Sequence, residues 1–293
     1  MTQGKLKSLA ELREKFNALK KGKVSLLQLI SEVELPEAVY NSNAIENSTL
    51  TLPDTERVLL ELEVSKEYSL REVFEAKNLA RVTEYIEKKT SGIVINSEVI
   101  LFLHNLLIGG IDDSIAGRFR KTGEFVRIGS HIAPAPEHIV RMIEVLTHDY
   151  ASNHTSDIVN KIASFHLQFE TIHPFCDGNG RIGRVLINLQ LQQYGYPHII
   201  IRDKEKTKYY DTFKQYREKK TIAKLETVIY LALLESLNKR ITYLENSEVI
   251  TLAKYAKENK ETLTSLINKA RRQTIPAFRE KGVWKIAASY KLS

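Results

Sequence analysis

One segment, from His173 to Arg184, constrains this chain more than any other part of its sequence, which there reads HPFCDGNGRIGR. The Gly-Asn-Gly run at 178–180 lets the backbone adopt positive φ and turn its N–H groups inward, as a nest for anionic oxygen. Apolar residues then recur at helical spacing, which predicts a helix after the glycines. Because a helix N-terminus also favours anions, we expect a phosphate-binding loop directly before a helix.

The side chains of this segment supply the other groups that phosphate chemistry needs. Imidazole titrates near neutral pH, so His173 can take a proton from a hydroxyl. Asp177 offers hard carboxylate oxygens of the kind that hold Mg²⁺ together with a substrate's phosphates. Arg181 and Arg184 stand three residues apart, hence on one helical face, and can both point at a polyphosphate. Each feature alone is commonplace, but the combination predicts chemistry on a phosphate.

With these residues the segment resembles the signature of the Fic family, His-x-Phe-x-Asp/Glu-Gly-Asn-Gly-Arg-x-x-Arg, and every specified position matches. The resemblance implies transfer of AMP from ATP to a Ser, Thr or Tyr hydroxyl of a target protein or of the enzyme itself, with Mg²⁺ and release of pyrophosphate. It implies that His173 is the catalytic base and that Asp177 holds Mg²⁺. Kinase-type members alter Gly-Asn-Gly, so its retention favours nucleotidyl transfer. The residues implied to bind nucleotide phosphates are Gly178, Asn179, Gly180, Arg181 and Arg184.

A second informative feature lies near the N-terminus, in an expected helix over about 36–47 that begins at Pro36. Ser42 and Glu46 stand four residues apart and therefore share a face of that helix. The run Ser42-x-x-x-Glu46-Asn47 resembles the Fic inhibitory pattern, Ser/Thr-x-x-x-Glu-Gly/Asn. By that resemblance, Glu46 would pair with Arg184 and withdraw it from the γ-phosphate, which implies an autoinhibited enzyme.

Alternating apolar and polar residues between Gly123 and Gly129 predict a short strand or a hairpin. The resemblance implies that this hairpin is a flap over the active site, which binds the target segment through backbone hydrogen bonds. It also places Tyr209 and Tyr210 near the nucleotide base, although helical aromatic residues are more often part of a core. The residues of the expected flap are Gly123, Glu124, Phe125, Val126, Arg127 and Ile128.

The pattern of the remaining chain is mainly helical, so we expect a mainly α fold of the Fic type with a short hairpin flap. The expected domains are an N-terminal helical region (1–95), a catalytic core (96–244) and a small C-terminal winged helix (245–293). The expected helices, besides 36–47, are 6–20, 70–89, 96–107, 135–150, 158–172, 181–194, 206–219 and 222–244.

The basic charge of the chain is concentrated in its C-terminal part. From Val249 to Ser293 there are ten Lys or Arg and three Asp or Glu, so the net charge of +7 of the whole chain resides there. Two short helices and a hairpin in this part resemble the winged domains of excisionase-type DNA-binding proteins. The sequence leaves DNA contact and protein docking equally open. The candidate DNA contacts are Lys269, Arg271, Arg272 and Lys285.

The composition bears on disulfide bonds, membrane contact and the cellular compartment of the protein. The sequence has a single cysteine, Cys176, which excludes an intramolecular disulfide. Its place inside the motif allows a cysteine–histidine nucleophile as an alternative interpretation. We find neither a signal peptide nor the roughly 18 to 20 apolar residues of a membrane span, and expect a cytoplasmic protein without membrane contact.

Three functions therefore remain open at the level of sequence. The first is an autoinhibited protein adenylyltransferase that uses ATP and Mg²⁺ on a target protein. The second is a Fic enzyme that transfers another nucleotide or phosphate-containing group, or that removes AMP from a modified target. The third is a DNA-binding regulator with a nucleotide-sensing core. Self-association into a homo-oligomer is left open.

Overall fold

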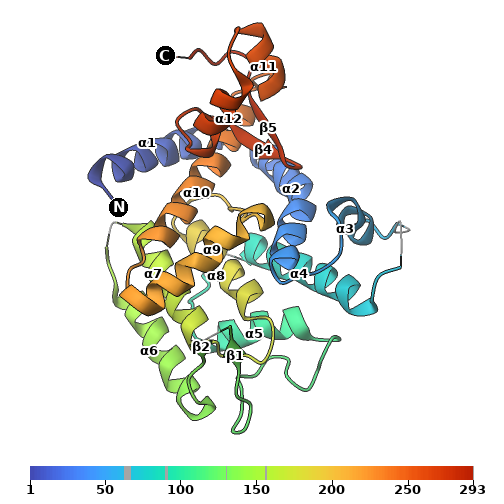
Figure 1. Ribbon diagram of the computed structural model, residues 1–293, viewed down its shortest axis with the longest axis vertical. Helices are drawn as coiled ribbons and strands as arrows, with labels where there is room; N and C mark the ends of the chain where they lie inside the picture. Colours follow the sequence, from blue (N-terminus) through green and yellow to red (C-terminus); the bar gives the residue numbers. More distant parts are fainter. Residues whose placement is uncertain (63–66, 90–91, 130, 156, 293) are drawn as a thin grey trace. The chain divides into compact units, whose positions relative to one another are not determined.

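The computed structural model describes residues 1–62, 67–89, 92–129, 131–155 and 157–292 (Figure 1). Over this part of the chain the elements are helices α1 to α12, two short 3₁₀ helices (Pro136–His138 and Asp203–Glu205) and two small antiparallel sheets, which confirms a mainly α fold. No helix in the described part is long and apolar enough to cross a membrane. Contacts group the residues into two compact units, 35–194 with 200–226, and 1–34 with 195–199 and 227–293.

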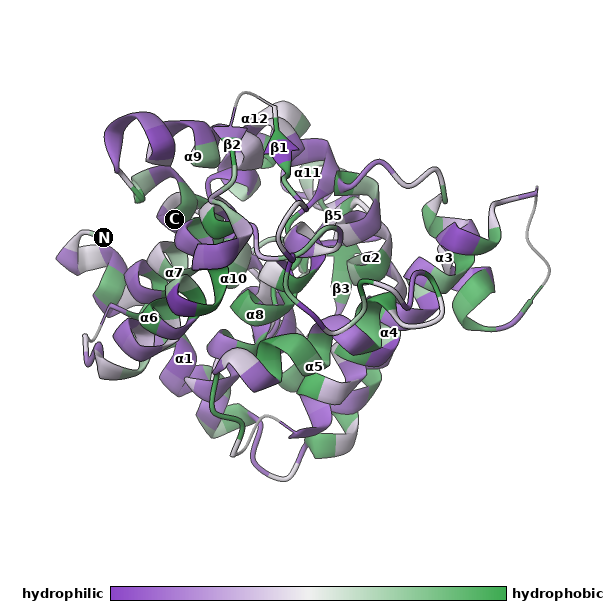
Figure 2. Ribbon diagram, turned by 90° about the horizontal axis from the view of Figure 1, so that it is seen from below, coloured by the Kyte–Doolittle hydropathy of each residue, from purple (hydrophilic) through white to green (hydrophobic). Residues whose placement is uncertain are grey.

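The unit that carries the motif is built around α8, which packs against α4, α5 and α7. Its core is formed by apolar side chains such as Leu103, Phe169 and Leu186, each with no exposed surface. Figure 2 shows α5 as mostly hydrophobic, as expected of a helix within such a core. The helices wholly within this unit are α3 (Leu52–Leu59), α4 (Leu70–Lys89), α5 (Ser97–Ile108), α6 (Ile139–Ser152), α7 (Ile158–Ile172), α8 (Asn179–Gln193) and α9 (Lys206–Lys219).

Local sequence explains where several of these helices begin. The side chains of Thr51, Asn96 and Asp157 cap α3, α5 and α7, each accepting a hydrogen bond from a backbone N–H in the first turn. The ranges expected for α4, α7 and α9 agree with the observed bounds. The short helix α3 was not predicted from the sequence.

Among the expected helix starts that differ from the structure, two bear on the site. Helix α2 (Val24–Ile45) does not begin at Pro36 but runs through it, so this proline lies in the helix interior. Helix α8 begins at Asn179 and not at Arg181. Consequently only Gly178 of the Gly-Asn-Gly run has positive φ, at 82°, because the other two residues already belong to the helix.

Helices α2 and α10 (Ala223–Leu244) end in the same way. Each is followed by Glu-Asn-Ser, and the asparagine has positive φ, 68° at Asn47 and 53° at Asn246. Left-handed backbone is tolerated best by glycine and asparagine, which explains why a Gly/Asn position follows the glutamate in the inhibitory pattern. Glu46 therefore lies in the turn after α2, one residue beyond the helix in which it was expected.

The predicted hairpin is present. Strands β1 (Arg127–Ile128) and β2 (His131–Ile132) pair antiparallel, with Arg127 opposite Ile132. The Ala133 N–H donates to the Val126 carbonyl at 3.0 Å and extends the pairing.

The other unit contains α1 (Gln3–Leu19) and a C-terminal sheet of order β3-β5-β4, built from β3 (Val249–Thr251), β4 (Phe278–Glu280) and β5 (Val283–Ala287). Helices α11 (Leu252–Glu258) and α12 (Leu263–Arg271) pack on each other over a core that includes Tyr255 and Leu266. Its assignment as a winged helix stays a prediction. Of the candidate DNA contacts, Arg271 and Arg272 are exposed, Lys269 is half-buried, and Lys285 forms an ion pair with Glu280 at 2.5 Å.

We predict that Arg279→Ala lowers the free energy of unfolding by about 3 kcal/mol, because it leaves the buried Glu235 carboxylate without its cation. Arg279 holds Glu235 through two nitrogens at 3.0 and 2.7 Å and stacks on Trp284, 4.6 Å from its ring centre. Since Trp284 is the only tryptophan of the sequence, urea unfolding can be followed by its fluorescence. Arg271→Ala, at an exposed site, is the control, and equal midpoints for both variants would contradict the prediction.

Candidate functional site

The loop of the motif is held by side chains that fix its backbone. Asn179 accepts a hydrogen bond from the Phe175 N–H at 2.9 Å and donates to the Phe175 carbonyl at 2.8 Å. Phe175 is fully buried and stacks on His104, with ring centres 3.7 Å apart. Phe175 thus anchors the loop in the core, while the Asn179 side chain braces the loop and leaves the helix N-terminus of α8 open toward an anion.

His104 is the residue that ties this loop to α5. The Gly117 N–H donates to its Nδ1 at 3.0 Å, so the proton resides on Nε2, which donates to the Asp177 carbonyl at 3.0 Å. Burial lowers the pKa of His104 to about 4, which keeps the ring neutral and in this tautomer. In the sequence, His104 lies within an apolar helical run, which gives no sign of this role.

His173 stands at the end of α7 in a left-handed conformation, with φ of 50°. Burial, followed by the charge of Arg120, lowers its pKa to about 4, so its imidazole is neutral at pH 7. Its Nδ1 is buried and lies 3.8 Å from Glu170 Oε2. The His173 side chain as a whole is 16% exposed.

Arg120 connects the base of the hairpin to the His173 loop. Its guanidinium donates to the carbonyls of His173, Glu124 and Pro134 at 2.9, 2.8 and 3.0 Å, and its N–H donates to the Pro174 carbonyl. A buried arginine with several carbonyl partners fixes the backbone of both segments at once. This role was missed, since nothing local in the sequence indicates that Arg120 is buried.

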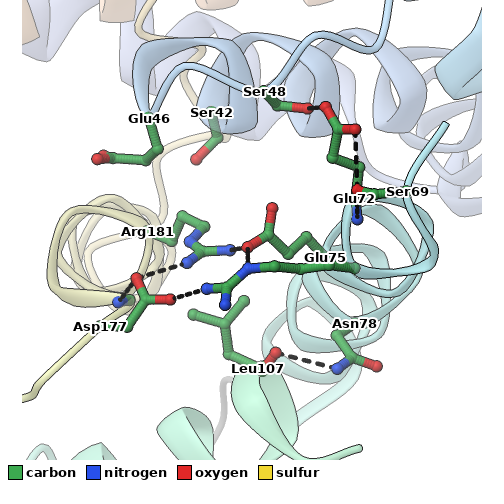
Figure 3. A network of polar contacts seen from close by, with 12 residues as sticks. Ser42, Glu46, Ser48, Ser69, Glu72, Glu75, Asn78, Leu107, Asp177 and Arg181 are labelled. Carbon is green, nitrogen blue, oxygen red and sulfur yellow. Dashed lines mark hydrogen bonds and ion pairs between the residues drawn. The ribbon is translucent and has the colours of Figure 1, made fainter. Parts of the chain in front are cut away.

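Asp177 and Arg181 belong to a network of alternating charges with the first turns of α4 (Figure 3). Arg181 donates to Asp177 Oδ1 at 2.9 Å and to Glu75 Oε1 at 3.1 Å. Arg71 completes the network by contacting Glu75 and Asp177. Although burial raises it, the pKa of Asp177 lies below its ordinary value because Arg181, the Gly178 N–H and Arg71 favour the carboxylate. The carboxylate is therefore ionised at pH 7.

The contact implied by the inhibitory pattern joins Arg184 to the end of α2. Arg184 Nη2 lies 2.9 Å from Glu46 Oε1 and 2.7 Å from the Ser42 carbonyl, and Nε donates to Ser42 Oγ at 2.9 Å. The guanidinium is only 7% exposed. Its Nη1 has no hydrogen-bond partner among the described residues. The structure thus brings Ser42, Glu46 and Arg184 together, as the sequence suggested.

Two glycines of α8 make room for carboxylates. A Cβ at Gly180 would clash with Glu46 Oε1 and lie 3.1 Å from Arg184 Nη1. A Cβ at Gly183 would likewise clash with Glu170 Oε1. Burial, followed by the charge of Glu46, raises the pKa of Glu170 to about 8. Glu46 therefore lies directly over the first turn of α8, where the sequence placed the anion site.

The two tyrosines of α9 lie beside this contact. Tyr209 is buried, its hydroxyl is 2.7 Å from His166 Nε2, and its ring centre is 5.9 Å from the Arg184 guanidinium carbon. The Tyr210 hydroxyl donates to the Ile45 carbonyl at 2.6 Å, at the end of α2. Their predicted contact with a nucleotide base stays a prediction.

The expected flap residues divide into a base and an exposed tip. Glu124 accepts two hydrogen bonds from Arg118, both at 2.7 Å, and these with the Lys121 N–H lower its pKa to about 2. Phe125 is 64% exposed, and Arg127 is exposed in β1. The Cys176 thiol contacts Glu124, and burial and that carboxylate raise its pKa, which disfavours a cysteine nucleophile.

These contacts bring together a helix N-terminus, two buried arginines, one ionised aspartate and a neutral histidine. Residues 94–191 match the family described as Fic/DOC. The chain therefore contains a Fic domain and belongs, over that segment, to the Fic/DOC family.

Relatives and solved structures agree with this assignment. "Protein adenylyltransferase Fic" of Drosophila virilis is 31% identical over 217 residues, which are 73% of this chain but 44% of that protein. This chain thus spans less than half of that relative. A Fic-domain signaling protein of Bacteroides thetaiotaomicron is 25% identical with a TM-score of 0.74, covering 82% of this chain and 97% of that one. Fic-1 of C. elegans is 25% identical with a TM-score of 0.71, covering 82% and 71%.

We predict that Asn179→Ala lowers the free energy of unfolding by about 2 kcal/mol, because it leaves the buried N–H and carbonyl of Phe175 without partners. Chemical denaturation measures the loss, and hydrogen exchange at the Phe175 amide shows whether it arises in this loop. Asn105→Ala, at an exposed position of α5 outside the motif, is the comparison. An unchanged exchange rate at Phe175 would refute the bracing role.

Proposed function

We propose that this protein is an autoinhibited protein adenylyltransferase, which transfers AMP from ATP to a hydroxyl of a target protein or of itself. The observation that carries the proposal is the position of Arg184. Its guanidinium lies over the N-terminus of α8, pairs with Glu46 through one nitrogen, and directs a second, partnerless nitrogen toward Gly180. An anionic ligand at this place would satisfy that nitrogen.

In the proposed reaction the target hydroxyl oxygen attacks the α-phosphorus of ATP. A new bond forms between them, the bond from the α-phosphorus to the bridging oxygen breaks, and pyrophosphate leaves with that electron pair. The hydroxyl proton passes to Nε2 of His173, which is neutral at pH 7 and therefore able to accept it. The N–H groups at the start of α8, with Arg181, would stabilise the charge on the phosphates.

A divalent cation fits this site through Asp177. The carboxylate is ionised and 34% exposed, and it adjoins the helix N-terminus where the phosphates would bind. Within the described residues no cluster of three His, Cys, Asp or Glu could hold a metal. A single carboxylate together with substrate phosphates is a usual arrangement for Mg²⁺. Bound there, Mg²⁺ would neutralise charge on the phosphates.

Inhibition would arise because Glu46 and a triphosphate compete for the same cation. A charge-assisted pair in a site of low exposure is a strong contact, and Ser42 holds the guanidinium in place with two further hydrogen bonds. While Glu46 occupies Arg184, the γ-phosphate lacks its clamp and the α-phosphorus is out of line for attack. ATP would then bind without reacting.

We predict that Glu46→Gly raises self-adenylylation by one or more orders of magnitude, because misplaced phosphates cost that much in rate. Labelled ATP with saturating Mg²⁺ measures the transfer. Arg184→Ala in the same chain should cancel the gain, since the phosphates then lack the clamp.

Glu245→Gly is a matched control, because Glu245 follows α10 as Glu46 follows α2, yet it pairs with Lys15 at 2.7 Å. It should leave transfer unchanged. Equal activity of the wild type and Glu46→Gly would refute autoinhibition by this contact. Label on no protein with any variant would refute the proposed activity itself.

We further predict that kcat/KM of the Glu46→Gly variant falls only at about pH 4 or below, and not near 6.5, because the Glu46 carboxylate, which raises the pKa of His173, is absent there. The pKa of His173 is lowered to about 4, so the ring stays unprotonated and able to act as a base at any pH above that value. A rate profile between pH 4 and 8 measures this. His173→Ala should reduce the rate roughly 10²- to 10⁴-fold with nucleotide affinity kept. An acidic midpoint near 6.5 would contradict the assignment.

A further inference from the structure

Asp177, the residue proposed to hold the divalent cation, already has the Arg71 guanidinium at its Oδ2 oxygen. Arg71 Nη2 lies 2.5 Å from Asp177 Oδ2, while Arg181 binds the other oxygen, Oδ1. Arg71 comes from the first turn of α4, 106 residues earlier in the chain. The outer face of this carboxylate is therefore occupied by a guanidinium.

A metal ion at the same carboxylate would meet two guanidinium groups within a few ångströms. Such like charges repel strongly where exposure is low, so one of the arginines must move away when the ion binds. The two differ in freedom. The Arg181 side chain is 3% exposed and also pairs with Glu75, so removing it from its partners would leave a buried cation unpaired.

Arg71 can leave at little cost. Its side chain is 56% exposed, and the Nε contact with Glu75, one turn along α4, does not depend on Asp177. A guanidinium that rotates into the solvent regains its hydration. An ion pair whose side chains are this exposed to solvent is weak. The network in Figure 3 can thus lose its Asp177–Arg71 contact while Arg181 and Glu75 stay paired.

We propose that Arg71 competes with the divalent cation for Asp177, an inference that rests on the proposed function. It sets how much Mg²⁺ the site requires before a nucleotide binds in its metal-bound form. The alternative role, a direct ligand of the nucleotide phosphates, would require Arg71 to remain at the site and predicts the opposite effect of its removal.

The test is the binding of α,β-methylene ATP, which cannot release pyrophosphate, measured by equilibrium dialysis in excess Mg²⁺ and in EDTA. All variants carry Glu46→Gly, so that Glu46 does not compete with the nucleotide. In Mg²⁺, Arg71→Ala should lower the Kd up to about fivefold, the factor that corresponds to an exposed ion pair of about 1 kcal/mol. In EDTA the Kd should not fall.

Arg81→Ala is the matched control, because Arg81 is an exposed arginine further along the same helix. It removes the same charge and should leave both Kd values unchanged. Arg71→Ala with a higher Kd in Mg²⁺, or with no change, would overturn the competition. Asp177→Asn should abolish the difference between Mg²⁺ and EDTA. If the difference persists in Asp177→Asn, the assignment of Asp177 as the metal ligand is wrong. If it disappears but Arg71→Ala does not lower the Kd in Mg²⁺, only the competition by Arg71 is wrong.

Discussion

A buried guanidinium must find partners for its N–H groups, and at Arg184 this requirement organises the site. The side chain is only 7% exposed, and its partners are Glu46 and Ser42, the latter 142 residues away in the sequence. Removing a partner from such a cation is costly, so the contact fixes the end of α2 against the first turn of α8. The same cation is the one that a triphosphate would need. In the proposed function, the stability of the resting structure and the restraint of its chemistry depend on this one interaction.

The first turn of α4 extends this arrangement to the other side of the site. Glu72 accepts hydrogen bonds from the N–H and hydroxyl of Thr49 at 2.7 and 2.8 Å, directly after the segment that contains Glu46. Its neighbours Arg71 and Glu75 contact Asp177 and Arg181. Figure 3 shows Glu72 beside Ser48 and Glu75 beside Arg181. One helical turn therefore holds both the inhibitory segment and the residues proposed to bind metal and phosphate.

The parts of this account that could be predicted from sequence are those set by local patterns. Apolar spacing and caps are local, so the ranges of α4, α7 and α9 agree with the structure. The start of α2 was wrong because proline is favoured in a first turn yet is also tolerated inside a helix whose other contacts hold it. Arg71 and Arg120 act through contacts distant in sequence, which no local pattern reports. Asn179 was identified as a motif residue, but the hydrogen bonds by which its side chain braces Phe175 were not predicted.

The central claim, that Glu46 withholds Arg184 from the γ-phosphate, is tested most directly by comparing α,β-methylene ATP with α,β-methylene ADP. Their Kd values would be measured for the wild type and for Glu46→Ala. The account predicts nearly equal affinities in the wild type, because the γ-phosphate finds no clamp there. In Glu46→Ala it predicts tighter binding of the triphosphate by roughly tenfold or more, the contribution of a charge-assisted hydrogen bond. The same ratio of affinities in both proteins would contradict it.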